Sequence, residues 1–246
     1  PNSSYMSVAR LLIKHLIPHM SAATDMYELL GERFDYSRLD DPRADVRLRL
    51  SSTVVNVEHT GPAASAGEVK VSYVRDGQTE SVHGSNVVLA CYHSIIPSLC
   101  PELPQIQREA LALQVKTPIL YTNVALHNWR AFKEMGVGAF VSPTGYHICT
   151  QLDFPVSLGD YAFAMSPDDP VIVHMERFPY GRGPDLSKRD RHRAGRYELL
   201  STPFADIERS IRDQLGEALA PGGFDAKRDI AGITVNRWAH GYSYWY

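Results

Sequence analysis

Apolar and polar residues alternate in three segments in the first half of the chain, a pattern typical of half-buried β-strands. The segments span residues 46–57, 69–74 and 79–82. Asp76-Gly77 is a hairpin signal between the second and third segments. A fourth run, 87–90 (VVLA), is apolar throughout, which predicts a strand buried on both faces of a sheet. The pattern therefore predicts a small antiparallel meander joined to a larger parallel sheet.

The second half of the chain predicts further strands at 119–126, at Val141 and at 147–152, 171–175 and 230–235. Its clearest helix follows Thr202-Pro203, because apolar residues then recur on one helical face through Leu219. Shorter helices are expected at 6–17, 25–30 and 105–114, whereas the charged, glycine-containing stretch 179–196 predicts a surface loop. Helices set apart from a mainly antiparallel sheet define an α+β domain.

Composition narrows the class of protein. A chain of 246 residues with 44% hydrophobic and 22% charged residues is an ordinary globular chain of one or two domains. A net charge of -3 without a basic run argues against a nucleic-acid partner. Because no apolar stretch approaches the ~20 residues of a membrane span, we expect a soluble protein, with cytoplasm and periplasm both left open.

The three cysteines are odd in number and lack CxxC spacing. This arrangement argues against a disulfide scaffold or a zinc site. We therefore expect Cys91, Cys100 and Cys149 to be buried thiols.

Four stretches, considered together, resemble one known family. They are 53–57 (TVVNV), 123–129, 150–161 (TQLDFPVSLGDY) and 233–244 (ITVNRWAHGYSY). Their order and spacing resemble the flavin-dependent amine oxidases, and most closely the bacterial spermidine dehydrogenase-type proteins. The resemblance implies part of an α/β, Rossmann-like FAD-binding domain with a β-meander at 1–115. It further implies an α+β substrate domain on a mainly antiparallel sheet at 116–236, and a return segment to the flavin domain at 237–246.

The sequence lacks a feature that this family carries. No GxGxxG fingerprint occurs, the chain starts at Pro1, and it stops in an aromatic cluster at Tyr246. In the family that fingerprint lies near the start of the chain, and a second flavin-contacting segment lies near its end. We therefore expect an internal fragment that lacks both segments and is inactive alone.

The resemblance implies FAD as the cofactor. Val54 takes the place of the family valine whose backbone meets the adenine. Ala90 and Cys91 lie on the strand that returns beneath the dinucleotide, and Trp238 lies on the flavin side. Some relatives also carry haem b, but no CxxCH or other ligand is identifiable here, so haem and the electron acceptor stay open.

Flavin amine oxidation removes a hydride from the carbon beside a neutral amine, so the cofactor carries the difficult step and the protein holds the amine. The predicted catalytic residues lie in the aromatic return segment: Trp238, His240, Tyr242 and Tyr244. Aromatic faces attract a cationic amine. The alternative is an aromatic core where two domains meet. His93, His147 and His174 are further acid–base candidates, with a satisfied structural histidine as the alternative for each.

Three carboxylates are candidates for substrate binding: Asp153, Asp160 and Glu176. A polyamine such as spermidine carries several positive charges, so an acid would recognise its distal ammonium. The alternative for each is a capping residue or a surface salt bridge. Two other functions remain open: a flavin oxidoreductase acting on a non-amine substrate, and a non-catalytic remnant that cannot hold FAD.

Overall fold

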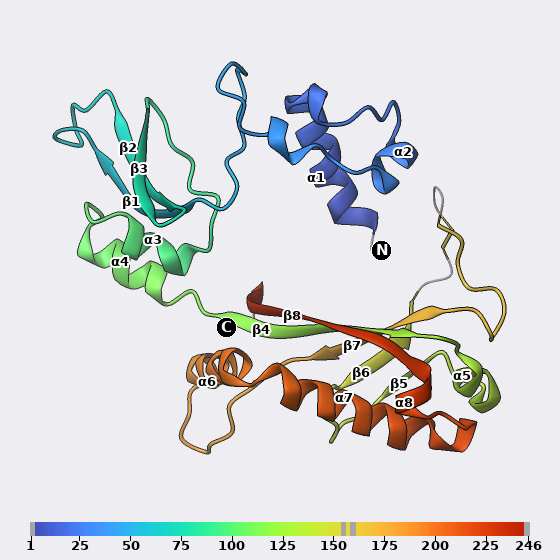
Figure 1. Ribbon diagram of the computed structural model, residues 1–246. Helices are drawn as coiled ribbons and strands as arrows, with labels where there is room; N and C mark the ends of the chain where they lie inside the picture. The colour runs from blue at the N-terminus through green and yellow to red at the C-terminus, as the bar shows by residue number, and fades with distance from the viewer. Residues whose placement is uncertain (1–2, 154–155, 158–160, 244–246) are drawn as a thin grey trace. The chain divides into compact units, whose positions relative to one another are not determined.

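The computed structural model describes residues 3–153, 156–157 and 161–243 and divides the chain into two compact units (Figure 1). The first unit comprises Pro1–Leu111 with Val156–Ala162, and the second comprises Ala112–Pro155 with Phe163–Tyr246. Each unit is built around its own sheet.

The first unit begins with a small helical cluster. Its elements are α1 (Ser3–Leu16), η1 (Pro18–Met20), α2 (Met26–Gly31) and η2 (Tyr36–Arg38). The Asp25 side chain caps α2 by accepting hydrogen bonds from the backbone N–H groups of Tyr27 and Glu28. Buried Ile17, Met20 and Leu39 form the core of the cluster. The predicted helices at 6–17 and 25–30 are thus confirmed.

A three-stranded antiparallel meander follows, in the order β1 (Thr53–His59), β2 (Val69–Arg75) and β3 (Gln78–Gly84). Asp76 and Gly77 adopt positive φ angles of 49° and 76°, as a tight two-residue hairpin requires. The predicted meander is confirmed, but the predicted start of its first strand at residue 46 is wrong. Ser51 has a φ of 51°, which interrupts an extended chain, and Leu48 donates its N–H to the carbonyl of Leu39 instead of joining the sheet.

The predicted buried strand at 87–90 is also wrong. These residues form no regular structure, and Val88 is 88% exposed. A strand needs hydrogen-bonding neighbours, and in the described part of the chain none pairs with this run. Within the same limits, the larger parallel sheet of a Rossmann-like domain does not form. The segment leads instead into η3 (His93–Ile95), α3 (Ile96–Leu99) and α4 (Gln105–Ala112).

The second unit contains a five-stranded sheet in the order β5-β6-β7-β4-β8, with every neighbouring pair antiparallel. The strands are β4 (Lys116–Leu126), β5 (Ala139–Val141), β6 (Cys149–Leu152), β7 (Val171–Arg177) and β8 (Ile230–Ser243). The predicted mainly antiparallel sheet is confirmed. The long strand β4 lies between β7 and β8, so it forms the central axis of the unit.

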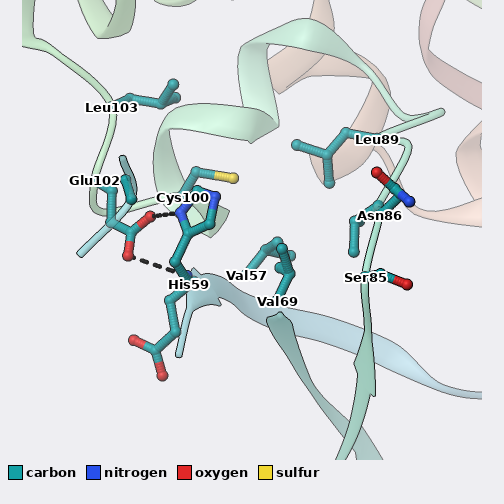
Figure 2. A pocket seen from close by; sticks show the side chains of 12 residues that line it. Val57, His59, Val69, Ser85, Asn86, Leu89, Cys100, Glu102 and Leu103 are labelled. Atoms are coloured by element: carbon teal, nitrogen blue, oxygen red, sulfur yellow. Dashed lines mark hydrogen bonds and ion pairs between the residues drawn. The ribbon is translucent and has the colours of Figure 1, made fainter. Parts of the chain in front are cut away.

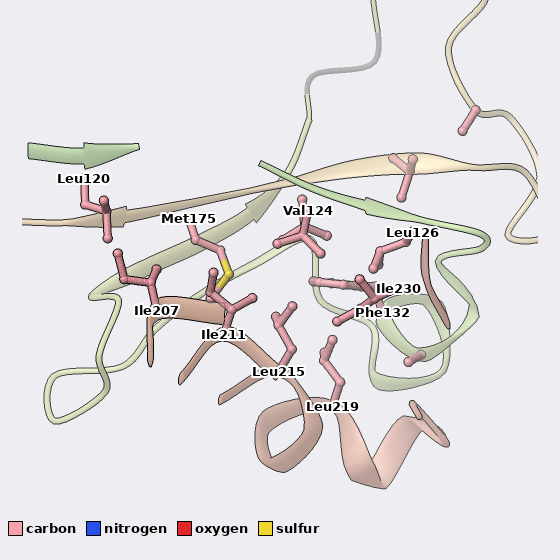
Figure 3. Close-up of a cluster of buried hydrophobic side chains, with 14 of the residues drawn as sticks. Leu120, Val124, Leu126, Phe132, Met175, Ile207, Ile211, Leu215, Leu219 and Ile230 are labelled. Carbon is pink, nitrogen blue, oxygen red and sulfur yellow. The ribbon is translucent and has the colours of Figure 1, made fainter. Parts of the chain in front are cut away.

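Helices cover one face of this sheet (Figure 1). They are α5 (Arg130–Met135), α6 (Lys188–Ser201), α7 (Phe204–Leu219) and α8 (Ala226–Asp229). The buried face of α7 carries Ile207, Ile211, Leu215 and Leu219, and it packs on Leu120, Val124 and Met175 of the sheet (Figure 3). Side chains alternate across a strand, so the odd-numbered neighbours on β4 point to the opposite face.

The surface loop predicted at 179–196 is confirmed for 179–187, but from Lys188 onward the helix α6 replaces it. Ser187 caps it, accepting a hydrogen bond from the N–H of Asp190, and Leu199 anchors it in the core. Its sequence is highly charged, so the apolar stripe that identifies most helices is weak here. Packing of a few residues onto the sheet, together with the cap, is sufficient to form the helix.

We expect Leu215→Ala to lower the free energy of unfolding by about 2–5 kcal/mol, because it opens a cavity between α7 and the sheet. Urea denaturation of the purified chain measures this change. The matched control is Leu200→Ala: Leu200 is 58% exposed on α6, so its loss should cost about 0.5 kcal/mol or less. Equal losses in the two variants would contradict the assignment of the core.

Candidate functional site

Polar and aromatic side chains gather on the face of the five-stranded sheet that α7 does not cover. On β4 this face carries Tyr121 and Asn123, which lie opposite Glu176 and His174 of β7. On the other side of β4, Trp238 and Tyr242 of β8 pair with Ile119 and Thr117. By alternation these side chains share one face of the sheet with their strand neighbours, among them Thr234, Asn236 and Gln151. We use the name polar face for six of its members: Tyr121, Asn123, His174, Glu176, Trp238 and Tyr242.

A chain of contacts runs across the polar face. The His174 Nδ1 atom lies 2.8 Å from Asn123 Oδ1, and its Nε2 atom lies 3.5 Å from Glu176 Oε1. The Tyr121 ring stacks against the imidazole with 4.8 Å between the ring centroids. The His174 and Glu176 side chains are only 15% and 24% exposed, so solvent screens this pair less than it screens a surface pair.

The Tyr121 phenol is tied into the same cluster. Burial raises its pKa to about 12, and the nearby Glu176 carboxylate and Tyr242, both hydrogen-bonded to it, add to the effect. The phenol is therefore neutral near pH 7 and keeps a proton to donate. This donor lies beside the Glu176 carboxylate, with which it shares a hydrogen bond.

The arginines of β7 and β8 point away from the polar face. Arg177 binds Glu198 of α6 and the carbonyl of Tyr146, and Arg237 donates to the carbonyl of Leu199 in α6. Both contacts lie on the helix-covered side of the sheet. The centre of the polar face thus presents a carboxylate and aromatic rings without an arginine, which is an arrangement suited to a cation.

Several residues predicted as site residues meet on this face, and others do not. Glu176, Trp238 and Tyr242 share it. Asp153 directly follows β6, and its N–H donates to the carbonyl of Ile172 at 2.8 Å, so it extends the pairing with β7. The predicted residues Asp160 and Tyr244 lie outside the described residues.

The structure sets His240 apart from the polar face. Its two ring nitrogens each lie 3.3 Å from Nη1 of Arg196, which belongs to the helix layer. Burial lowers the pKa of His240, and the neighbouring cations Arg196 and Lys116 lower it further. The catalytic role predicted for His240 stays a prediction, and in the structure its ring contacts Arg196 of α6. The cause is an irregularity in β8: between the pairs Thr117–Tyr242 and Ile119–Trp238, β8 advances four residues while β4 advances two.

The residues predicted to hold FAD lie in the first unit. Val54 is on β1 and partly exposed, whereas Ala90 and Cys91 are exposed in the irregular segment after β3. The exposure of Cys91 corrects the prediction that it is buried; Cys100 and Cys149 are partly buried, and all three thiols are free.

A cavity of about 410 Å³ lies near these residues in the first unit (Figure 2). Its walls include Val57, Val69 and Leu89, and its rim holds Glu102, which accepts hydrogen bonds from the backbone and ring of His59. No lysine or arginine lines it among the described residues. A dinucleotide diphosphate requires cations or a glycine-rich loop. The residues that line this cavity therefore do not fit the phosphate portion of FAD.

Two features are absent from the described residues. No cluster of three or more histidine, cysteine, aspartate or glutamate side chains is arranged to hold a metal ion there. Within the same part of the chain, no helix combines the length and the apolar character that crossing a membrane requires.

Sequence analysis missed two members of the polar face, Tyr121 and Asn123. The signal was present, because 119–126 alternates and its polar positions fall on one side of the strand. What the sequence does not show is which other strands lie beside them. That information comes only from the register of β4 with β7 and β8.

The chain resembles solved structures of amine oxidases. Putrescine oxidase bound to putrescine is 15% identical, with a TM-score of 0.47 over 89% of this chain and 39% of that chain. Cyclohexylamine oxidase from Brevibacterium oxydans IH-35A is 16% identical, with a TM-score of 0.46 over 75% of this chain and 33% of that chain. This chain thus spans between a third and two fifths of the length of these structures. No protein-family model and no curated protein matches it. At these values the likeness assigns no activity.

Beneath the polar face, on its helix-covered side, His147 is fully buried. Its Nε2 atom lies 2.9 Å from Thr122 Oγ1, and Gln214 of α7 binds its backbone N–H and carbonyl. Burial lowers the pKa of His147 to about 3, with smaller contributions from Arg177 and His174. The ring is thus a neutral core residue, which supports the structural alternative for this histidine.

This burial predicts a pH-dependent stability. Below pH 6.5 the unfolded chain protonates His147, whereas the folded chain does not do so until about pH 3. Stability should therefore fall as the pH falls between these values, by up to about 1.4 kcal/mol per pH unit from this residue. Urea denaturation at pH 7 and pH 5 should show a smaller loss in His147→Gln than in the wild-type chain. An unchanged pH dependence in the variant would contradict the assignment.

Proposed function

We propose that this chain carries the amine-binding surface of an FAD-dependent oxidoreductase that acts on amines. The observation that supports this most directly is the Glu176 carboxylate, held among aromatic rings on a face from which the neighbouring arginines point away. FAD enters the proposal through the sequence resemblance alone. The described residues are assigned to the amine, and haem is not part of the proposal.

The polar face binds an ammonium group by two complementary interactions. Glu176 supplies the negative charge and accepts a charge-assisted hydrogen bond from the ammonium. The rings of Tyr121, Trp238 and Tyr242 supply electron-rich faces for the adjacent carbons and for the cation. The Tyr121 phenol, hydrogen-bonded to Glu176, helps to hold the carboxylate among the rings before the amine arrives.

The finer proposal is a polyamine substrate such as spermidine. Asp153 lies opposite Ile172, and Glu176 lies four residues further along β7. At about 3.3 Å per residue, these two positions are separated by about 13 Å along the strand. Two carboxylates at such a separation suit a long cation that is charged at both ends, rather than a monoamine.

A second candidate is a chain that binds amines without oxidising them. The residues that line the cavity near Val57 do not fit a diphosphate, which favours this alternative. Oxidation of a non-amine substrate is the less favoured outcome, because a partly buried carboxylate in the site disfavours an uncharged apolar molecule.

Titration calorimetry with spermidine tests the amine site. We expect Glu176→Gln to weaken binding about tenfold or more, because the variant loses a charge-assisted hydrogen bond. The matched control is Glu217→Gln, an exposed position on α7, which should bind spermidine as the wild type does. Equal affinity in all three proteins would refute the site.

A visible spectrum of the protein expressed from its complete gene tests the oxidoreductase. A flavin band that bleaches on anaerobic addition of spermidine is the expected result. Spermidine binding without any flavin band would establish the non-catalytic alternative. A flavin that binds but ignores amines would support a non-amine substrate.

A further inference from the structure

We infer that His174 is a positioning residue: held by Asn123, it fixes the Glu176 carboxylate in the orientation that receives an ammonium group. The inference rests on the proposed amine site and adds a residue that acts on substrate only through another side chain. It comes from the contact chain Asn123–His174–Glu176, which crosses the polar face from β4 to β7.

Both nitrogens of the His174 ring are engaged by the protein. Nδ1 meets the Asn123 side chain at 2.8 Å, and Nε2 faces Glu176 Oε1 at 3.5 Å. Because the Asn123 partner atom is the amide oxygen, which only accepts, Nδ1 is the donor of that hydrogen bond. Donation from Nε2 to Glu176 then requires the imidazolium form, in which both ring nitrogens carry a proton. No ring nitrogen remains for a substrate, so His174 does not bind the amine directly.

Glu176 needs such a support because its side chain is long. Three side-chain torsions leave a glutamate free to sample many rotamers, and each costs free energy to order on binding. His174 and the Tyr121 phenol approach the carboxylate from two sides. If the carboxylate is already ordered before the ligand binds, less side-chain entropy is lost on binding. The affinity then rises without any new contact to the ligand.

The ring of His174 is itself fixed. It stacks on Tyr121 with 4.8 Å between centroids and is 15% exposed, so it has little room to rotate. Asn123 and Tyr121 both lie on β4, which pairs with β7 on one side and β8 on the other. The orientation of Glu176 is thus set by side chains of a strand that is paired along both of its edges.

Two substitutions of similar size separate the contacts of His174. In His174→Gln the side-chain amide nitrogen reaches the position of Nε2 and can still donate to Glu176. In His174→Asn the shorter amide reaches only the position of Nδ1, so the contact with Asn123 is kept and the contact with Glu176 is lost. We expect His174→Asn to weaken spermidine binding about tenfold in calorimetry, and His174→Gln to stay within about twofold of the wild type.

A double-mutant cycle shows whether His174 acts through Glu176. In the Glu176→Gln background, His174→Asn should have no further effect on spermidine affinity, because the carboxylate that it positions is already gone. An equal loss in both backgrounds would overturn the inference and make His174 a direct contact or a general structural residue. Thermal denaturation of each variant identifies any loss of folding.

A second readout is independent of any ligand. The imidazole nitrogen resonances of His174 at fixed pH should shift in Glu176→Gln and stay unchanged in Glu217→Gln. If wild-type protein does not bind spermidine but the resonances shift, the proposed function fails and the His174–Glu176 coupling stands. If the resonances do not respond to Glu176→Gln, the positioning role is refuted whatever the amine does.

Discussion

The packing of α7 against the sheet is the interaction on which the second unit depends. Ile207, Ile211, Leu215 and Leu219 are fully buried, and they cover the strand positions of Leu120 and its even-numbered neighbours. Strand alternation then leaves every odd-numbered side chain of β4 on the opposite face. A one-residue slip in register would exchange the two sets, so the apolar core and the polar face are specified together. The location of Glu176 and Tyr121 is therefore a consequence of hydrophobic burial on the other side of the sheet.

A single proline shapes the end of the site. Pro118 has no N–H to offer to β8, so the ladder between the two strands is interrupted at this point. The extra residues of β8 form the irregularity that separates Trp238 from Tyr242 and sends His240 toward Arg196 in the helix layer. Bulges next to binding sites commonly redirect side chains in this way. The aromatic segment thus contributes two rings to the polar face and one histidine to the interior.

The elements that the sequence predicted correctly are the meander, the antiparallel sheet and α7. Each buries one side, and this burial produces the regular spacing of apolar residues along the sequence. The prediction failed where a segment depends on partners that periodicity does not show. The run 87–90 has the composition of a buried strand but no neighbouring strand in the described residues, and α6 forms although its charged sequence lacks an apolar stripe. Of the candidate site, Glu176, Trp238 and Tyr242 were predictable by residue type. Tyr121 and Asn123 required the register of three strands, and the displacement of His240 required the irregularity opposite Pro118.

The two halves of the flavin hypothesis have different physical support. An amine site requires a fixed carboxylate and aromatic rings, and adjacent strands provide these on one face. A dinucleotide site requires a backbone shaped to the phosphates, which neither the cavity near Val57 nor the irregular segment around Cys91 provides. The proposed amine site can therefore be assessed from the second unit alone, because its contacts all lie between residues of β4, β7 and β8. The function of this chain is therefore tested most directly through the orientation of Glu176 and its effect on amine binding, rather than through the cofactor.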